Sequence, residues 1–157
     1  MEVRRVPMEQ LLPLLEEQLD HGYARLPVTG SSMLPMLRGG RDVVALARFE
    51  GAPRPGDVLL YRRESGQYVL HRLIRLERET CLLCGDNQWE REYLSCDHVI
   101  ARVEKFRRGG KWIDVETSRS YRLYTFVWTA LFPLRPMMIA TRRLLGRLRR
   151  IFRRDKR

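Results

Sequence analysis

The sequence predicts a mainly β protein that has a short N-terminal helix and a basic, amphipathic helical tail at its C-terminus. Short apolar segments alternate with glycine- and proline-containing turns through the middle of the chain. A helical apolar pattern precedes them, and an apolar and then arginine-rich stretch follows. The 157 residues, 44% of them hydrophobic, are enough for one core. We therefore expect an N-terminal helix in residues 1–22, a β-rich domain in residues 23–118 and a helical tail in residues 119–157.

The first two parts follow from the spacing of apolar residues. Residues 7–19 have apolar positions at helical spacing between glutamates, and His21-Gly22 is expected to end this helix. Six segments rich in apolar and β-branched residues then predict strands, at residues 43–46, 58–61, 68–74, 81–83, 99–106 and 111–115. Turn residues separate them, as at residues 53–57 and 109–110. Strands of this length and spacing are typical of a small antiparallel sandwich or barrel.

The third part is an apolar run followed by a basic segment. The run LYTFVWTALFPLRPMMIA, residues 123–140, contains one charge, Arg135, and residues 142–157 add nine basic residues and one acid. The run is barely long enough to span a bilayer, and Pro133, Arg135 and Pro136 interrupt it. We favour a helix that lies in the interface of an anionic membrane. A true span and a helical pair packed on the body with a solvated basic face are the alternatives.

Charge and cysteine usage give expectations about partners and location. The net charge is +11, most of it in the tail, and indicates an anionic partner. We expect a membrane surface rather than nucleic acid, because Phe152 is the only aromatic side chain among the tail arginines. Basic segments beside membrane helices stay cytoplasmic, the N-terminus has no long apolar run, and three cysteines favour a reducing compartment. We therefore expect a monomer on the cytoplasmic face of a membrane, without cofactor or metal.

The segment TGSSMLPML, residues 29–37, contains a candidate nucleophile. Ser32 lies between a glycine and a proline, where Gly30 permits a tight turn. A serine hydroxyl needs a base within hydrogen-bond reach and donors for the oxyanion, and Ser31 and the backbone N–H groups of such a turn can supply donors. Taken alone, a segment of this composition is more often an ordinary turn.

A candidate base and several candidate acids follow Ser32 in the sequence. His71 lies inside the strand-like run YVLHRLIRL, and the ordinary pKa of histidine suits proton transfer near neutral pH. Asp86, in CGDNQ, occupies a turn after the strand expected to pair with that of His71, so it is placed to orient the base. Asp97 is a second acid in reach of the same region.

The order of these segments resembles the catalytic domain of signal peptidase I. The segments are SSMLP, PGDVLLYRR, VLHRLIRL, CGDNQ and DHVIARV, from about residue 26 to residue 106. The chain is similar above all to the subfamily that uses histidine in place of lysine, and more widely to the LexA-like self-cleaving peptidases. The resemblance implies a twisted antiparallel β assembly in which Ser32 is the nucleophile, His71 the general base and Asp86 its supporting acid. It also implies that a signal- or leader-like peptide binds as an added β-strand.

The sequence departs from the family pattern at two places. The family often has a hydroxyl two residues before the nucleophile, where this chain has Gly30, so Ser31 or backbone N–H groups take that role. The histidine-type subfamily usually has a further aspartate after Gly-Asp-Asn, where this chain has Glu90 and Glu92. The acid is therefore open between Asp86, Glu90 and Asp97.

Two other classes of function compete with a peptidase. One is an inactive peptidase-fold module that binds an anionic membrane or nucleic acid through its basic tail. The other is a zinc module, suggested by Cys81, Cys84, Cys96 and His98. We disfavour zinc because residues 81 and 84, three apart in a strand, point to opposite faces.

Overall fold

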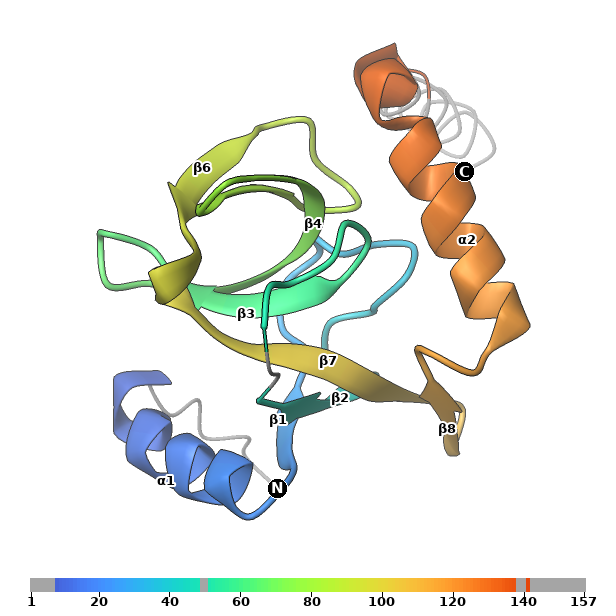
Figure 1. Ribbon diagram of the computed structural model, residues 1–157. Helices are drawn as coiled ribbons and strands as arrows, with labels where there is room; N and C mark the ends of the chain where they lie inside the picture. The colour runs from blue at the N-terminus through green and yellow to red at the C-terminus, as the bar shows by residue number, and fades with distance from the viewer. Residues whose placement is uncertain (1–7, 49–50, 138–140, 142–157) are drawn as a thin grey trace, which may run out of the picture.

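The computed structural model describes residues 8–48, 51–137 and 141, and the described chain is mainly β (Figure 1). One antiparallel sheet has the strand order β1-β2-β7-β3-β4-β5-β6, and β8 pairs with β7 off this path. The strands are β1 (Ala24–Pro27), β2 (Val43–Ala47), β3 (Val58–Arg62), β4 (Tyr68–Glu77), β5 (Thr80–Cys84), β6 (Glu92–Ser95), β7 (Val99–Arg108) and β8 (Lys111–Asp114). The sheet curls into a half-barrel in which β4, β5 and β6 arch over β3.

The six predicted strands are confirmed, but the sheet has two strands that the sequence did not predict. β1 and β6 have four residues each, and each lies at one end of the strand order. Four residues are too few to show the alternating apolar pattern that identifies a strand in a sequence. The sheet is a single curled sheet instead of two packed layers or a closed barrel.

Alternation along the central strands creates two separate cores. On β3, Leu60 packs into the larger core, whereas its neighbours Leu59 and Tyr61 pack into a smaller one inside the curl. Helix α1 (Met8–Asp20) closes the larger core through Leu15 and Leu19, as its amphipathic pattern predicts. The same alternation on β4 sends adjacent side chains to opposite faces, which decides the geometry of the site.

The C-terminal part of the described chain packs against the body along one side. Helix α2 (Arg119–Ala130) begins at the N-cap Ser118, and the 3-10 helix η2 (Phe132–Leu134) follows it. Tyr121 is buried in the larger core, with its ring centroid 5.7 Å from that of Phe106. Within the described residues no helix is both long and apolar enough to cross a bilayer. The arginine-rich segment, residues 142–157, lies outside the described residues.

Candidate active site

Ser32 is presented by a closed loop between β1 and β2. The Val28 N–H donates to the Asp42 carbonyl (3.0 Å) and so joins the two ends of the loop. Gly30 has φ +73°, a left-handed conformation that glycine adopts without strain, as its place in a tight turn predicted. The loop has its own apolar anchors, since three of its side chains are buried in the body: Met33, Met36 and Leu37. The loop is therefore fixed from below, while Ser32 is half-buried and Ser31 is exposed.

A second loop, residues 85–88 between β5 and β6, holds the serine loop beside His71. The Asn87 N–H donates to the Ser32 carbonyl (2.7 Å), and the Asn87 side-chain amide donates to the Ser31 carbonyl (3.3 Å). Gly85 lies between the two candidate residues: a Cβ there would be 2.7 Å from the Ser32 carbonyl oxygen and 3.1 Å from His71 Nε2. Gly85 thus lies beside both the Ser32 carbonyl and the His71 ring, where there is no room for a side chain.

His71 is buried, with only 1% of its surface exposed, and its two ring nitrogens have different surroundings. Nδ1 lies 3.0 Å from the Tyr61 hydroxyl and 3.2 Å from a carboxylate oxygen of Glu92. Because a carboxylate only accepts hydrogen bonds, we assign the proton of the neutral ring to Nδ1. Nε2 then keeps its lone pair on the side of Gly85 and Ser32.

Burial sets the charge state of the histidine. It lowers the pKa of His71 to about 4, and the nearby Glu92 carboxylate only partly opposes this effect. The ring is therefore neutral at physiological pH, the state in which an imidazole can accept a proton. Burial alone would raise the pKa of Glu92, but hydrogen bonds from Arg63, one of them 2.7 Å long, and from Tyr61 lower it on balance. Glu92 is accordingly ionised beside the neutral imidazole.

Asp86, which the sequence suggested as the supporting acid, is bound by a different partner. Arg72 Nε and Nη2 each donate to one of its carboxylate oxygens at 2.8 Å, and both side chains are fully buried. The Tyr124 hydroxyl donates to the same carboxylate (3.1 Å). His71 and Arg72 are adjacent on β4 and point to opposite faces, so Asp86 lies on the far side of the strand from Nδ1. The acid in contact with His71 is Glu92.

The two alternative acids do not occupy the position beside His71 either. Glu90 is exposed, and the Asp97 carboxylate accepts a hydrogen bond from Ser95 Oγ (3.2 Å) at the start of the 3-10 helix η1 (Cys96–His98). Glu92 is the first residue of β6, the edge strand that the sequence did not predict. The sequence shows Glu92 two residues after Glu90. Because β6 was not predicted, however, nothing in the sequence indicated that the Glu92 side chain faces β4.

Arg135 lies next to the candidate site, although its sequence context suggested a segment at a membrane interface. It lies in the apolar run that suggested a membrane interface, yet its side chain is fully buried in the protein. Its guanidinium donates to the carbonyls of Gly85 (3.3 Å) and Trp128 (3.1 Å), and it lies 3.8 Å from the Asp86 carboxylate. Arg135, which follows η2, therefore contacts the glycine that lies beside the Ser32 carbonyl and the His71 ring.

The cysteines and His98 considered for zinc have other partners. Cys84 Sγ donates to the Gly85 carbonyl (3.4 Å), and a ring nitrogen of His98 lies 2.9 Å from the Arg62 carbonyl. Cys81 and Cys96 contact each other. In the described parts of the chain, no group of three or more histidine, cysteine or acidic side chains is arranged to hold a metal ion.

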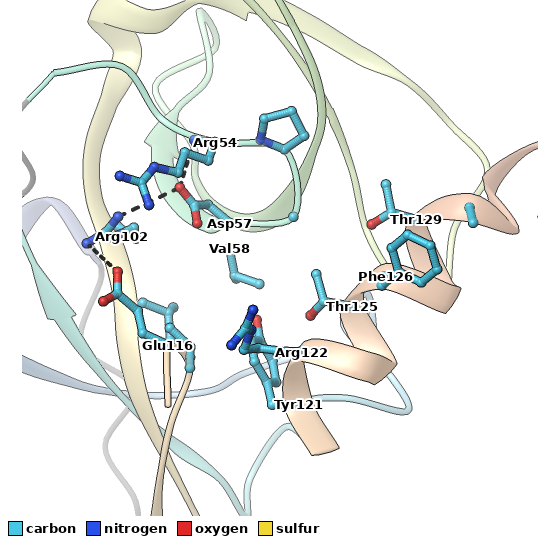
Figure 2. Close-up of a pocket in the computed structure, with 15 residues that line it drawn as sticks. Arg54, Asp57, Val58, Arg102, Glu116, Tyr121, Arg122, Thr125, Phe126 and Thr129 are labelled. Carbon is cyan, nitrogen blue, oxygen red and sulfur yellow. Dashed lines mark hydrogen bonds and ion pairs between the residues drawn. The ribbon is translucent and has the colours of Figure 1, made fainter. Parts of the chain in front are cut away.

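A hollow of about 940 Å³ lies between α2 and the turn that precedes β3 (Figure 2). On one side of it Arg102 lies between Asp57 (4.0 Å) and Glu116 (3.5 Å), and on the other side Phe126 projects from α2. Gly56, which also lines the hollow, accepts a hydrogen bond from Arg72 (2.7 Å). The hollow is thus next to the Arg72–Asp86 pair and separate from Ser32 and His71.

The sequence matches no protein-family model, and no curated protein is similar to it. The functional proposal therefore depends on the geometry of the site.

Proposed function

We propose that the protein is a serine endopeptidase of the signal-peptidase type, in which Ser32 is the nucleophile and His71 the general base. The observation that carries the proposal is the position of His71: its Nε2 and the Ser32 carbonyl both lie beside Gly85, while its Nδ1 lies 3.2 Å from Glu92. We assign to Glu92 the role of supporting acid that the family resemblance gave to Asp86. A hydroxyl, an imidazole and a carboxylate in this order are the working parts of a serine hydrolase.

In the proposed reaction, Ser32 Oγ attacks the scissile carbonyl carbon while His71 Nε2 accepts the hydroxyl proton. The ionised Glu92 stabilises the imidazolium that forms at that moment. Backbone N–H groups of the Gly30–Ser32 turn, with Ser31, would donate to the oxyanion. His71 then gives its proton to the leaving amine, and a water molecule releases the acyl group from Ser32 by the same steps in reverse.

The substrate of this site would be an extended peptide. β1 lies at one end of the strand order and pairs with β2 alone among the described strands, so one of its edges is open. Its last residue, Pro27, leads into the loop that carries Ser32. A peptide added as a further strand beside β1 would pass in front of that loop, which supports a signal- or leader-like substrate with small side chains before the cleaved bond.

The pH dependence of peptide cleavage tests this assignment. Because burial lowers the pKa of His71 to about 4, the base stays unprotonated well below neutral pH. We expect kcat/KM for an extended signal-like peptide to be level from pH 8 to about 5 and to fall about tenfold per pH unit below about 4. Circular dichroism at each pH would separate this fall from acid unfolding. A fall centred near 6.5, the ordinary histidine pKa, would contradict the role of the buried His71.

Glu92→Gln and Glu90→Gln form a matched pair of variants for the same prediction. Glu92 raises the pKa of His71 against the larger effect of burial, so Glu92→Gln should move the acid limb to lower pH. It should also lower kcat by about 10²–10⁴, because the imidazolium loses its carboxylate partner. Glu90 is exposed, and Glu90→Gln should leave both quantities unchanged. If the two substitutions changed the acid limb and kcat equally, Glu92 would not be the supporting acid.

We also propose that the outer side of α2 and η2 docks the protein on an anionic membrane. Tyr121 and Tyr124 attach α2 to the body, while five large apolar side chains on this segment are 42–72% exposed: Leu123, Phe126, Val127, Leu134 and Met137. Exposed apolar residues beside Arg119 and Arg122, with the arginine-rich sequence 142–157 following, have the composition of an interfacial helix. The alternative is a catalytically inactive module. It would bind the membrane through this same surface but would not cleave peptides.

Vesicle flotation tests the docking surface. Wild-type protein should float with vesicles that contain anionic lipid, and Leu123→Ser should weaken binding about tenfold. Leu14→Ser is the control, because Leu14 is a similarly exposed leucine (57%, against 64% for Leu123) on the other helix. Equal binding of both variants, or binding to DNA without flotation, would exclude docking through α2.

A further inference from the structure

The sulfur atoms of Cys81 and Cys96 lie 2.6 Å apart. Cys81 is on β5, and Cys96 is the first residue of η1, directly after β6. The pairing of β5 with β6, which places Thr80 opposite Ser95, fixes the two segments at this point, and the Cys96 N–H donates to the Glu79 carbonyl (2.8 Å). The separation is only roughly 0.5 Å longer than a disulfide bond, so the two sulfur atoms are already close to bonding distance.

We propose that Cys81 and Cys96 are an oxidation site, at which an intramolecular disulfide joins β5 to the end of β6. The third cysteine is placed apart from this pair. Cys84 is buried, and its thiol donates to the carbonyls of Gly85 and Gln88, both at 3.4 Å. Of the three cysteines, Cys81 and Cys96 would thus form the disulfide, and Cys84 would remain a buried thiol. The proposal does not rest on the proposed peptidase activity.

The oxidant would be a small disulfide such as oxidised glutathione, or a protein disulfide. Cys96 is half-buried and Cys81 is fully buried, so the oxidant meets Cys96 first. The Cys96 thiolate attacks the external disulfide and releases one thiol, and the Cys81 thiolate then attacks the Cys96 sulfur and releases the second. The protein loses two electrons and two protons, and the external disulfide becomes two thiols. Burial raises the pKa of Cys81, so the second step should be faster at higher pH.

The bond would also secure the strand that carries Glu92. β6 has four residues and lies at the edge of the sheet, where β5 is its partner. Glu92 is at one end of β6, and Cys96 follows the other end. A covalent link at Cys96 would hold β6 on β5 and would restrict the unfolded chain, because the two cysteines are 15 positions apart.

The test uses the full-length chain in a glutathione buffer that is either oxidising or reducing. After alkylation and proteolysis under oxidising conditions, mass spectrometry should detect a linked pair of peptides that contains residues 81 and 96, about 2 Da lighter than the sum of the reduced peptides. Thiol titration of the denatured protein should then find one free thiol among the three cysteines. The melting temperature should be about 6 to 12 °C higher than under reducing conditions.

Two variants make the result specific. Cys84→Ser should keep both the linked peptides and the thermal shift, whereas Cys96→Ser should lose both. Three free thiols under oxidising conditions, a link that involves Cys84, or a stable glutathione adduct on Cys96 as the end product would each overturn the proposal.

Discussion

Ser32→Ala is expected to abolish peptide cleavage, by a factor of about 10³ or more, while the fold stays intact. The loss follows from the proposed role of Oγ as the attacking atom. The fold should survive because Ser32 holds the adjacent loop through its backbone carbonyl, which accepts from the Asn87 N–H (2.7 Å) and which alanine retains. Cleavage rates of a signal-like peptide, together with thermal unfolding of the variant, would check both parts of the prediction.

Ser31→Ala is the matched control. Ser31 is exposed and likewise contacts Asn87 through its carbonyl, so its alanine variant keeps the same loop contact. As Ser31 at most assists the oxyanion, the rate should fall much less than in Ser32→Ala. Near wild-type cleavage by Ser32→Ala, or equal losses in the two variants, would remove Ser32 as the nucleophile.

Asp86→Asn is expected to lower the free energy of unfolding by about 3 to 5 kcal/mol at neutral pH. The substitution keeps the size of the side chain but removes the charge that two buried guanidinium groups face. Arg72 binds both carboxylate oxygens at 2.8 Å, and Arg135 lies 3.8 Å from one of them. In the variant, each guanidinium group would remain buried without its counter-charge. An unpaired buried charge strongly destabilises the folded state. Denaturant unfolding with circular dichroism measures the change directly.

Glu77→Gln serves as the reference for Asp86→Asn. Glu77 also pairs with an arginine, Arg75, but the two side chains are 56% and 63% exposed. Its removal should change the free energy of unfolding by less than about 0.5 kcal/mol. If Asp86→Asn left stability unchanged but shifted the pH dependence of cleavage, Asp86 would instead be the acid that acts on His71.

The strands that the sequence predicted are those with a strong local pattern. The apolar alternation of β3, β4 and β7 is strong, whereas Ser32 and His71, which both lie beside Gly85, were chosen as candidates from the order of the segments around them. The contact between Glu92 and His71 was not predicted, because it depends on which face of β4 the Asp86 and Glu92 side chains reach. That depends on the pairing of β6, a short edge strand whose four residues have no apolar pattern.

The C-terminal segment shows a second limit of sequence patterns. An apolar helix with tyrosines has the same composition whether it lies on a membrane or packs on a protein. In the structure the two sides of α2 differ: Tyr121 is buried, whereas Phe126 is 72% exposed. The single charge in the apolar run, Arg135, was taken as an interruption, because its partners, Asp86 and the Gly85 carbonyl, lie about fifty positions earlier and no local pattern connects them.

The contact between Arg135 and Gly85 has a consequence for the order in which the protein is made. Ribosomes add about 5–20 residues per second, and Arg135 follows Gly85 by 50 positions. A nascent chain therefore contains Ser32, His71 and Glu92 for several seconds before Arg135 is added. Until then the loop at Gly85 lacks its contact with Arg135. Tyr124, which completes the shell around Asp86, also comes late, 38 positions after it. The contacts that Arg135 and Tyr124 make with the loop around Gly85 and Asp86 can therefore form only after both candidate residues, Ser32 and His71, have been synthesised.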